Sequence, residues 1–221
     1  MTVTITASRK RVSMAARIGL TIMILLFLST AAIFASEEER AYDGTSERTS
    51  ERVYEKVIAH GGGAYRGYDT TNSVEALNQA IANGYKIIEL DMELSTDHKI
   101  IMLHDWDRTA EHYYGAVFPN KLSQSSFLNL SVHGQFEVLT FDKLAVIMKR
   151  NPDIRIVTDT KGDNEELLTV IRNDYPDLAG RIIPQIYDYD EYQTVFDLGY
   201  RDVIFTLYKQ ETVDIGRLAG F

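Results

Sequence analysis

The sequence predicts an α/β fold in which helices cover a parallel sheet or barrel. Short runs rich in Val and Ile are nearly continuous in apolarity, as expected of strands that are covered on both faces. Amphipathic stretches separate most of these runs, and such strand–helix alternation is typical of parallel architectures. The predicted strands are Val57–His60, Ile87–Met92, Ile100–His104, Ile154–Thr160, Arg181–Tyr187 and Asp202–Leu207.

The stretches between the strands carry apolar residues at helical spacing. In the first, an Asn72–Glu75 pair resembles a capping box, and Gly84 follows its predicted end. The predicted helices are Asn72–Asn83, Phe141–Arg150, Glu165–Asn173 and Glu191–Leu198.

Two features bear on the topology. Only the eight residues Met92–Lys99 join the second and third strands, which is too short for a crossover helix. The connection is therefore an antiparallel hairpin or an extended return, and the site predicted below favours the extended return. About six strands are complete by Leu207, whereas a closed barrel has eight. A barrel would thus be incomplete at the C-terminus, as in a truncated sequence.

The composition fits one globular domain and excludes several kinds of site. Of the 221 residues, 45% are apolar, which suffices for one core, and 25% are charged, which argues against disorder. The chain has no cysteine, so disulfides, thiolate metal ligands and a cysteine nucleophile are excluded. The net charge is -9, and an acidic body is expected to repel nucleic acid.

Residues 1–36 are predicted to be a signal peptide or membrane anchor. Basic residues from Arg9 to Arg17 precede Ile18–Ala35, an uncharged run of 18 residues that we expect to form a hydrophobic helix. The positive-inside rule then places the body outside the cell, either extracellular or anchored to the cell membrane. Ser36 ends a small-residue cleavage site. Residues 37–53 are a polar linker, and residues 54–221 form the body.

Ionisable residues gather where the predicted strands end. The carboxyl ends of parallel strands are the usual place for a site, and residues two apart share one face of a strand. Ionisable groups rarely enter strands unless they are paired or bound to a metal. These residues therefore predict one shared site. They are His60, Glu89, Asp91, His104, Asp159 and Lys161.

The residue types indicate the chemistry of this site. Three neighbouring carboxylates repel one another and call for a hard divalent cation, Mg²⁺ or Ca²⁺. A divalent cation together with Lys161 suits an anionic phosphate, and two histidines can serve as general acid and base. The glycines Gly61–Gly63 either present N–H groups to phosphate oxygens or form a tight turn.

Short segments around these residues form an ordered series. They are His60–Gly63, Thr71–Ser73, Glu89–Asp91, Ser95–Asp97, His104–Asp105 and Asp159–Lys161. In order and spacing the series resembles the glycerophosphodiester phosphodiesterase family, which is related to the phosphatidylinositol-specific phospholipases C. The similarity extends from Val57 to about Leu207.

The resemblance implies a TIM-type barrel and a role for each residue. It implies hydrolysis of a glycerophosphodiester to glycerol 3-phosphate and an alcohol, in lipid metabolism, after attack by a neighbouring glycerol hydroxyl. The implied roles are acid/base catalysis for His60 and His104, metal binding for Glu89, Asp91 and Asp159, and phosphate or substrate binding for Lys161, Arg66 and Gln185.

The chain departs from the family pattern at three positions. Gly61 replaces the usual Arg, Thr71 replaces a Glu, and Asp159 replaces a Glu. Arg66, in the same loop as Gly61, is a candidate substitute for the missing cation. These departures keep open an exported, non-catalytic phosphodiester-binding domain on a degenerate barrel. A glycoside hydrolase using Glu89 and Asp159 is the other alternative.

The segment from Asp105 to Gln135 has no clear periodicity and is long for a plain loop. Its aromatic residues either line an acyl or headgroup pocket or form a local core. They are Trp106, Tyr113, Tyr114 and Phe118.

Overall fold

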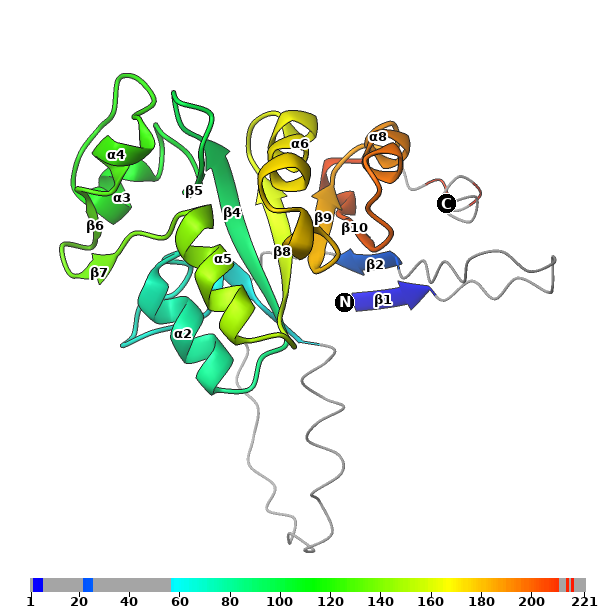
Figure 1. Cartoon of the computed structure of the whole chain (residues 1–221), viewed down its shortest axis with the longest axis horizontal. Helices are drawn as coiled ribbons and strands as arrows, with labels where there is room; N and C mark the ends of the chain where they lie inside the picture. The colour runs from blue at the N-terminus through cyan, green and yellow to red at the C-terminus, as the bar shows by residue number, and fades with distance from the viewer. Residues whose placement is uncertain (1, 6–21, 26–56, 211–213, 215, 217–221) are drawn as a thin grey trace, which may run out of the picture.

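The fold is given by a computed structural model that describes residues 2–5, 22–25, 57–210, 214 and 216. Its main sheet has eight strands in the order β1-β2-β10-β9-β8-β4-β3, and β5 pairs with β4 (Figure 1). The strands are β1 (Thr2–Ile5), β2 (Ile22–Leu25), β3 (Ile58–Ala59), β4 (Ile87–Leu94), β5 (Ile100–Met102), β6 (Ser131–Val132), β7 (Phe136–Glu137), β8 (Arg155–Thr160), β9 (Ile182–Ile186) and β10 (Val203–Phe205). The helices are η1 (His60–Gly62), α2 (Val74–Ala82), α3 (Ala110–Tyr114), α4 (Gln124–Phe127), α5 (Phe141–Arg150), α6 (Asn164–Asp174), α7 (Pro176–Ala179), α8 (Glu191–Asp197) and η2 (Leu207–Lys209).

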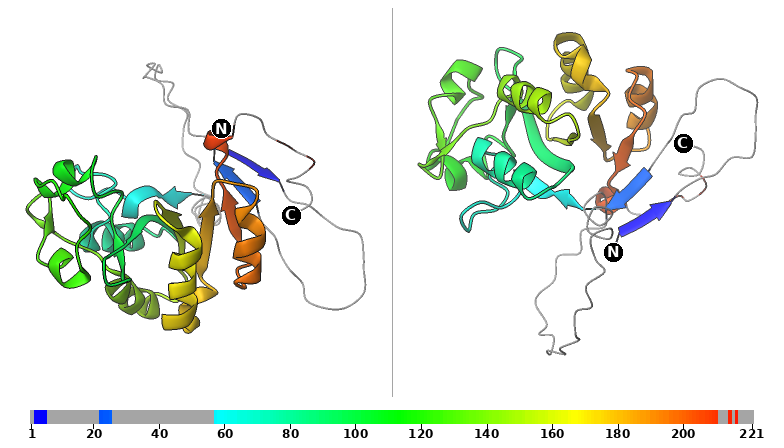
Figure 2. Two further views of the ribbon diagram at one scale, coloured as in Figure 1. Left: turned by 90° about the horizontal axis from the view of Figure 1, so that it is seen from above. Right: turned by 60° about the horizontal axis from the view of Figure 1, so that its bottom comes forward.

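The parallel part of the sheet confirms the predicted α/β architecture. Strands β3, β4, β8, β9 and β10 are parallel neighbours, and the predicted helices appear as α2, α5, α6 and α8. The views in Figure 2 show these strands as part of a barrel rather than a closed ring. The described residues thus form a half-barrel with helices on its outside.

Strand alternation separates an outer face from an inner face of the half-barrel. Ile88 and Leu90 of β4 are fully buried in the same cluster as Leu77 of α2 and Leu144 of α5, so this face packs against the helices. The inner face begins with an apolar layer at the amino ends of the strands. This layer contains Val157, Ile183 and Ile204, with Ile58 and Ile87 packed against them. The polar site begins at the level of this layer with Glu89, opposite Val157, and extends toward the carboxyl ends of the strands.

The connection between β4 and β5 corrects the predicted extended return. The two strands are antiparallel, with Met92 opposite Met102 and Leu94 opposite Ile100. Strand β4 is eight residues long and continues past Asp91, so the chain must turn and descend again. β5 is therefore a return strand, and the estimate of six barrel strands counted one too many.

The predicted capping box at Asn72 is also wrong. The N-cap of α2 is Ser73, whose hydroxyl accepts a hydrogen bond from the Ala76 N–H at 3.2 Å. Glu75 accepts a hydrogen bond from the backbone N–H of Glu137. The Asn72 side chain instead forms hydrogen bonds with Asp91 of β4, as described below.

Residues 105–137 form a side lobe next to β5, visible beside the barrel strands in Figure 1. The lobe contains α3, α4, β6 and β7 and has a buried cluster of its own that includes Trp106, Phe127 and Phe136. Tyr113, Tyr114 and Phe118 pack against this cluster. The aromatic residues of this segment thus belong to a local core.

The structure does not show the predicted N-terminal hydrophobic helix. Ile22–Leu25 form β2, which pairs in parallel with β10 and antiparallel with β1. A run of Ile, Met and Leu suits a strand that is paired on both sides. The rest of Ile18–Ala35 and the linker 37–53 lie outside the described residues. Within the described parts of the chain, no helix combines the length and apolarity needed to cross a membrane.

The helix-facing side of β4 should dominate the stability of the body. Leu90 is fully buried between Glu89 and Asp91, and we expect Leu90→Ala to lower the free energy of unfolding by about 2–5 kcal/mol. Urea denaturation would measure the loss. Val146→Ala on α5 is the control, because Val146 is 48% exposed and its truncation should cost little. Equal effects of the two substitutions would contradict the assignment of faces.

Candidate active site

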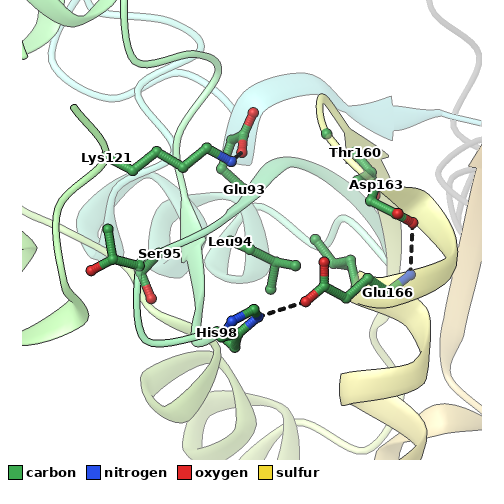
Figure 3. Close-up of a pocket in the computed structure, with 11 residues that line it drawn as sticks. Glu93, Leu94, Ser95, His98, Lys121, Thr160, Asp163 and Glu166 are labelled. Atoms are coloured by element: carbon green, nitrogen blue, oxygen red, sulfur yellow. Dashed lines mark hydrogen bonds and ion pairs between the residues drawn. The ribbon is translucent and has the colours of Figure 1, made fainter. Parts of the chain in front are cut away.

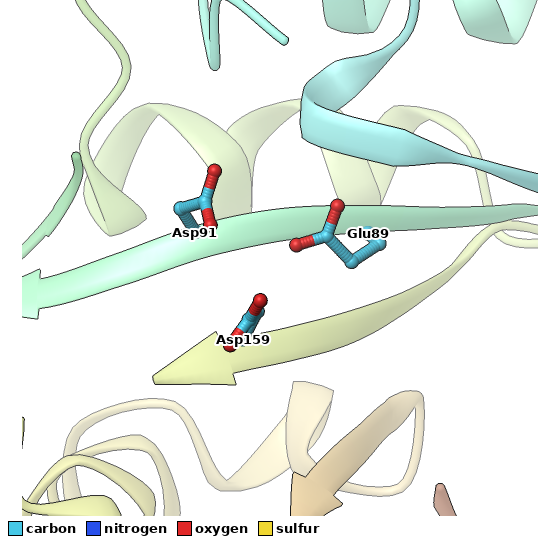
Figure 4. Close-up of side chains that lie close together, drawn as sticks. All are labelled: Glu89, Asp91 and Asp159. Atoms are coloured by element: carbon cyan, nitrogen blue, oxygen red, sulfur yellow. The ribbon is translucent and has the colours of Figure 1, made fainter. Parts of the chain in front are cut away.

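Three carboxylates meet on the inner face of the half-barrel. Asp91 of β4 lies directly opposite Asp159 of β8 in the parallel ladder, and Glu89 precedes Asp91 by two residues on the same face. One oxygen from each carboxylate can be chosen so that all three atoms lie within 4.8 Å of one another (Figure 4). All three residues are buried. The structure thus brings these three predicted site residues together.

Of the three carboxylates, Glu89 has the fewest contacts that offset its buried negative charge. Its Oε2 accepts the Gly61 N–H at 2.6 Å, whereas its Oε1 is buried without a hydrogen-bond partner. Burial, followed by the neighbouring charge of Asp91, raises the pKa of Glu89 well above its ordinary value. A cation bound to Oε1 would offset both the cost of burying the charge and the repulsion from Asp91.

Lys161 lies between the two aspartates. Its Nζ is 2.6 Å from an oxygen of Asp159 and 3.0 Å from an oxygen of Asp91. Burial alone would lower the pKa of Lys161, but the two aspartates more than offset this and hold the pKa above its ordinary value. The ammonium is therefore charged at neutral pH and faces the site.

Asn72 fixes the orientation of Asp91, a role that the sequence did not reveal. Its Nδ2 donates to Asp91 Oδ2 at 2.8 Å, and its Oδ1 accepts the Asp91 N–H at 3.0 Å. Asn72 has a φ of 50°, a left-handed conformation that Asn tolerates better than most residues. The signals in the sequence were its place in the Thr71–Ser73 segment of the family-like series and its position just before a helix N-cap.

Asp159 is held from the other side by β9. The Tyr187 hydroxyl donates a short hydrogen bond to Asp159, and the Gln185 side chain donates to the Tyr187 oxygen at 2.6 Å. Burial and then the charge of Asp159 raise the pKa of Tyr187, so its hydroxyl stays protonated. The structure therefore places Gln185 behind Tyr187, where it supports the carboxylate cluster.

The two histidines reach the site along different paths. His60 begins the turn after β3, and its Nε2 is 3.8 Å from Glu89 Oε2. His104 follows β5, whose descent brings the Leu103 N–H to the Asp91 carbonyl at 3.2 Å. The antiparallel return thus still delivers His104 to the level of Asp91.

Asp105 orients His104. The His104 Nδ1 lies 2.7 Å from Asp105, which also accepts the N–H groups of Arg108 and Thr109. Burial alone would raise the pKa of Asp105, but these hydrogen bonds outweigh it and hold the pKa below its ordinary value. An ionised carboxylate only accepts, so Nδ1 carries a proton, and Nε2 is the acceptor in the neutral form of such an imidazole.

The chain is similar to known proteins in sequence and in fold. Residues 60–168 match the Glycerophosphoryl diester phosphodiesterase family. This part of the chain belongs to that family. No curated protein sequence is significantly similar to the chain.

Solved glycerophosphoryl diester phosphodiesterases share the fold. One from Parabacteroides distasonis ATCC 8503 has a TM-score of 0.55 and 16% identity, over 70% of this chain and 54% of that one. A second structure from the same organism has a TM-score of 0.55 and 20% identity, over 74% of this chain and 69% of that one. A structure from Thermotoga maritima has a TM-score of 0.54 and 20% identity, over 72% of this chain and 64% of that one. The half-barrel is therefore part of a TIM-like barrel fold, and the chain spans just over half the length of the first of these structures.

The loop geometry explains why this family member has Gly61 in place of the usual Arg. Gly61 has a φ of 56°, and a Cβ built there would lie 2.4 Å from the Thr70 Cα. No side chain fits without moving the backbone. The Gly61 N–H goes to Glu89, and the Gly63 N–H donates to the His60 carbonyl at 2.9 Å. The structure thus favours a tight turn over phosphate binding for these two donors.

Arg66 is not brought to the carboxylates in this structure. It is exposed, and its guanidinium lies over the Tyr65 ring at 5.2 Å from the ring centroid. Thr71, which replaces the family's Glu, is buried with its hydroxyl 2.8 Å from that of Ser73. Among the described residues, Lys161 is therefore the cation nearest the predicted phosphate site.

The donor set fits a divalent cation. Three carboxylates supply oxygen ligands only, as Mg²⁺ and Ca²⁺ prefer. The unpartnered Glu89 Oε1 is a second sign, because buried oxygens normally have a partner. Glu89, Asp91 and Asp159 would hold the ion.

Glu89→Gln should have opposite effects on stability in the absence and presence of the cation. With chelator at neutral pH the substitution should raise Tm. The folded-state pKa of Glu89 lies above its unfolded-state value, so Glu89 lowers stability as the pH rises above the unfolded-state value, and glutamine has no such cost. The gain in Tm should vanish as the pH falls below about 4.3, the pKa of a glutamate in the unfolded chain.

The cation itself should stabilise the unsubstituted chain by about 2.7 kcal/mol at a hundred times its Kd, and this gain should be lost in Glu89→Gln. Thermal denaturation with Mg²⁺, Ca²⁺ or chelator would measure both effects. Asp153→Asn, which breaks an exposed pair with Lys86, is the control. A lower Tm of Glu89→Gln with chelator would contradict the assignment.

Gly61→Ala should destabilise the chain by more than Gly67→Ala. Both glycines have positive φ, which costs a side chain about 1–2 kcal/mol, but a Cβ at Gly67 meets nothing within 4 Å. The difference in free energy of unfolding, measured in urea, reports the clash with Thr70. Gly61→Arg, which restores the family's residue, should be at least as destabilising as Gly61→Ala. A stable and more active Gly61→Arg would overturn this account.

Proposed function

We propose that the chain is a metal-dependent phosphoric diester hydrolase that cleaves glycerophosphodiesters to glycerol 3-phosphate and an alcohol. One observation carries the proposal: three buried carboxylates, one of them with an unpartnered oxygen, share the inner face of a half-barrel with a charged lysine. The family match over residues 60–168 supports the same chemistry.

A divalent cation held by these carboxylates would neutralise phosphate charge and polarise the P–O bonds. Lys161 supplies a further positive charge for the phosphate from the same mouth. Its pairing with Asp91 and Asp159 fixes the ammonium in place before substrate arrives. The chain therefore holds the carboxylates and the lysine in place before the substrate binds.

The histidines move the protons in the proposed reaction. One takes the proton from a glycerol hydroxyl as it attacks the phosphorus, and the other protonates the leaving alcohol. Water then opens the cyclic phosphate with the roles reversed. His104, with Nδ1 bound to Asp105 and Nε2 available, is arranged to accept a proton first. Asp105 is a positioning residue in this scheme.

The decisive experiment is hydrolysis of a glycerophosphodiester by the full chain, with Mg²⁺ or Ca²⁺ and with chelator. We expect cation-dependent release of glycerol 3-phosphate. His60→Ala and His104→Ala should each lower kcat by about 10²–10⁴-fold, the usual contribution of general acid–base catalysis. Enzymatic quantification of glycerol 3-phosphate gives the rate.

His112→Ala is the matched control, because His112 is an exposed histidine of the side lobe and its loss should leave the rate unchanged. A folded chain that binds the diester without turnover would instead support the non-catalytic binding domain.

We also propose that the body acts outside the cytoplasm, held at the membrane or released by cleavage after the hydrophobic segment. The support is the charge pattern before Ile18–Ala35. In a bacterial host, the body of the expressed chain should be degraded by protease added to spheroplasts. Protection from that protease until the cells are lysed would contradict the proposal.

A further inference from the structure

A fourth carboxylate follows the metal-binding pair on β4. Glu93 is two residues beyond Asp91 and therefore points to the same inner side. Its side chain is only 8% exposed, and it is not one of the three clustered acids. A buried carboxylate is costly unless it is paired with a cation or hydrogen-bonded. The mechanism proposed above leaves this group without a role.

The partner of Glu93 comes from the side lobe. Lys121 Nζ lies 3.0 Å from Glu93 Oε2, while the Lys121 side chain is 48% exposed. The pair faces a cavity of about 220 Å³ at the carboxyl ends of β4 and β8 (Figure 3). The cavity is also lined by Gly162, which directly follows Lys161, and by Thr160. It therefore adjoins the predicted phosphate site.

Glu93 is the buried acid among the described residues that line the cavity, since Asp163 is exposed and the Glu166 side chain is 43% exposed. Thr160 also lines the cavity, but it lies opposite Met92 in the ladder, so its side chain belongs to the helix-facing side. The cavity thus presents one buried anion that is already bound to one ammonium.

On the basis of the proposed function, we propose that Glu93 is a specificity-determining residue that selects phosphodiesters whose alcohol carries a primary ammonium. The Lys121 ammonium occupies the position that the substrate ammonium would take. Because Lys121 is half exposed, its release into water costs little. The substrate then replaces one ammonium by another at the same carboxylate.

The spacing fits a short amino alcohol. Successive inward positions on a strand are about 7 Å apart. A two-carbon amino alcohol ester has four single bonds of about 1.5 Å between phosphorus and nitrogen, and flexible side chains cover the rest. A phosphate at the level of Asp91 thus brings the ammonium within reach of Glu93.

The lining also distinguishes kinds of ammonium. Quaternary ammonium groups are usually held by aromatic rings, because they have no N–H to donate. None of the described residues around this cavity is Trp, Tyr or Phe. The ethanolamine diester should therefore be preferred over the choline diester.

The test compares kcat/KM of the full chain for glycerophosphodiesters of ethanolamine, choline and glycerol. We expect ethanolamine to be preferred over the neutral glycerol headgroup. Glu93→Gln should lower the ethanolamine-to-glycerol ratio by about tenfold, as loss of one charged hydrogen bond implies. Lys121→Met removes the competing ammonium and should raise the same ratio. Asp153→Asn, far from the cavity in an exposed ion pair, should leave the ratio unchanged.

If the Glu93–Lys121 ion pair only joined the side lobe to the barrel, the two variants should change the ethanolamine-to-glycerol ratio in the same direction. Opposite shifts of this ratio in the two variants would therefore support the proposed role of Glu93. Equal changes in both variants for all three diesters, or unchanged ratios, would overturn the role of Glu93. A preference for choline would overturn the primary-ammonium assignment. If the unsubstituted chain hydrolysed none of the diesters, the proposed function itself would fail, which is a different outcome.

Discussion

The parallel pairing of β4 with β8 is the constraint on which the site depends. It sets Asp91 opposite Asp159 on the inner face, so two like charges are forced together by backbone hydrogen bonds. Glu89 adds a third because strand alternation leaves it no other direction. The rest of the local structure reduces this repulsion. Lys161 contributes charge, while Asn72 and Tyr187 contribute hydrogen bonds.

The inner face is layered, and the layers separate folding from chemistry. An apolar layer at the amino ends joins neighbouring strands through residues such as Val157 and Ile183. Polar groups begin with Glu89, which lies opposite Val157 in the ladder, and continue toward the carboxyl ends of the strands. The apolar layer and the helix-facing side supply the hydrophobic stabilisation. The half-barrel can therefore carry an energetically unfavourable acidic cluster without losing its core.

The sequence predicted the strands, the outer helices and the carboxylate cluster, because strand periodicity alone assigns Glu89, Asp91 and Asp159 to one face. The predictions from the sequence failed where contacts between residues distant in the sequence determine the local structure. The extended return was preferred because length alone did not show that β4 continues beyond Asp91. Asn72 was assigned to a cap because local pattern cannot show a partner on another strand. Tyr187, whose partner Asp159 lies on β8, was missed as a positioning residue for the same reason. The contact of Asp105 with His104 is local, but the sequence does not show how the two side chains are oriented.

The close approach of Gly61 to Thr70 has an evolutionary consequence. A side chain at position 61 requires the backbone at position 70 to move, and that backbone is tied to the Gly61 carbonyl through Asn72. Neither loop can therefore change alone without cost. An arginine directly after His60 therefore requires a change in the Thr70 loop as well, and a cation in its place is more easily supplied by another element.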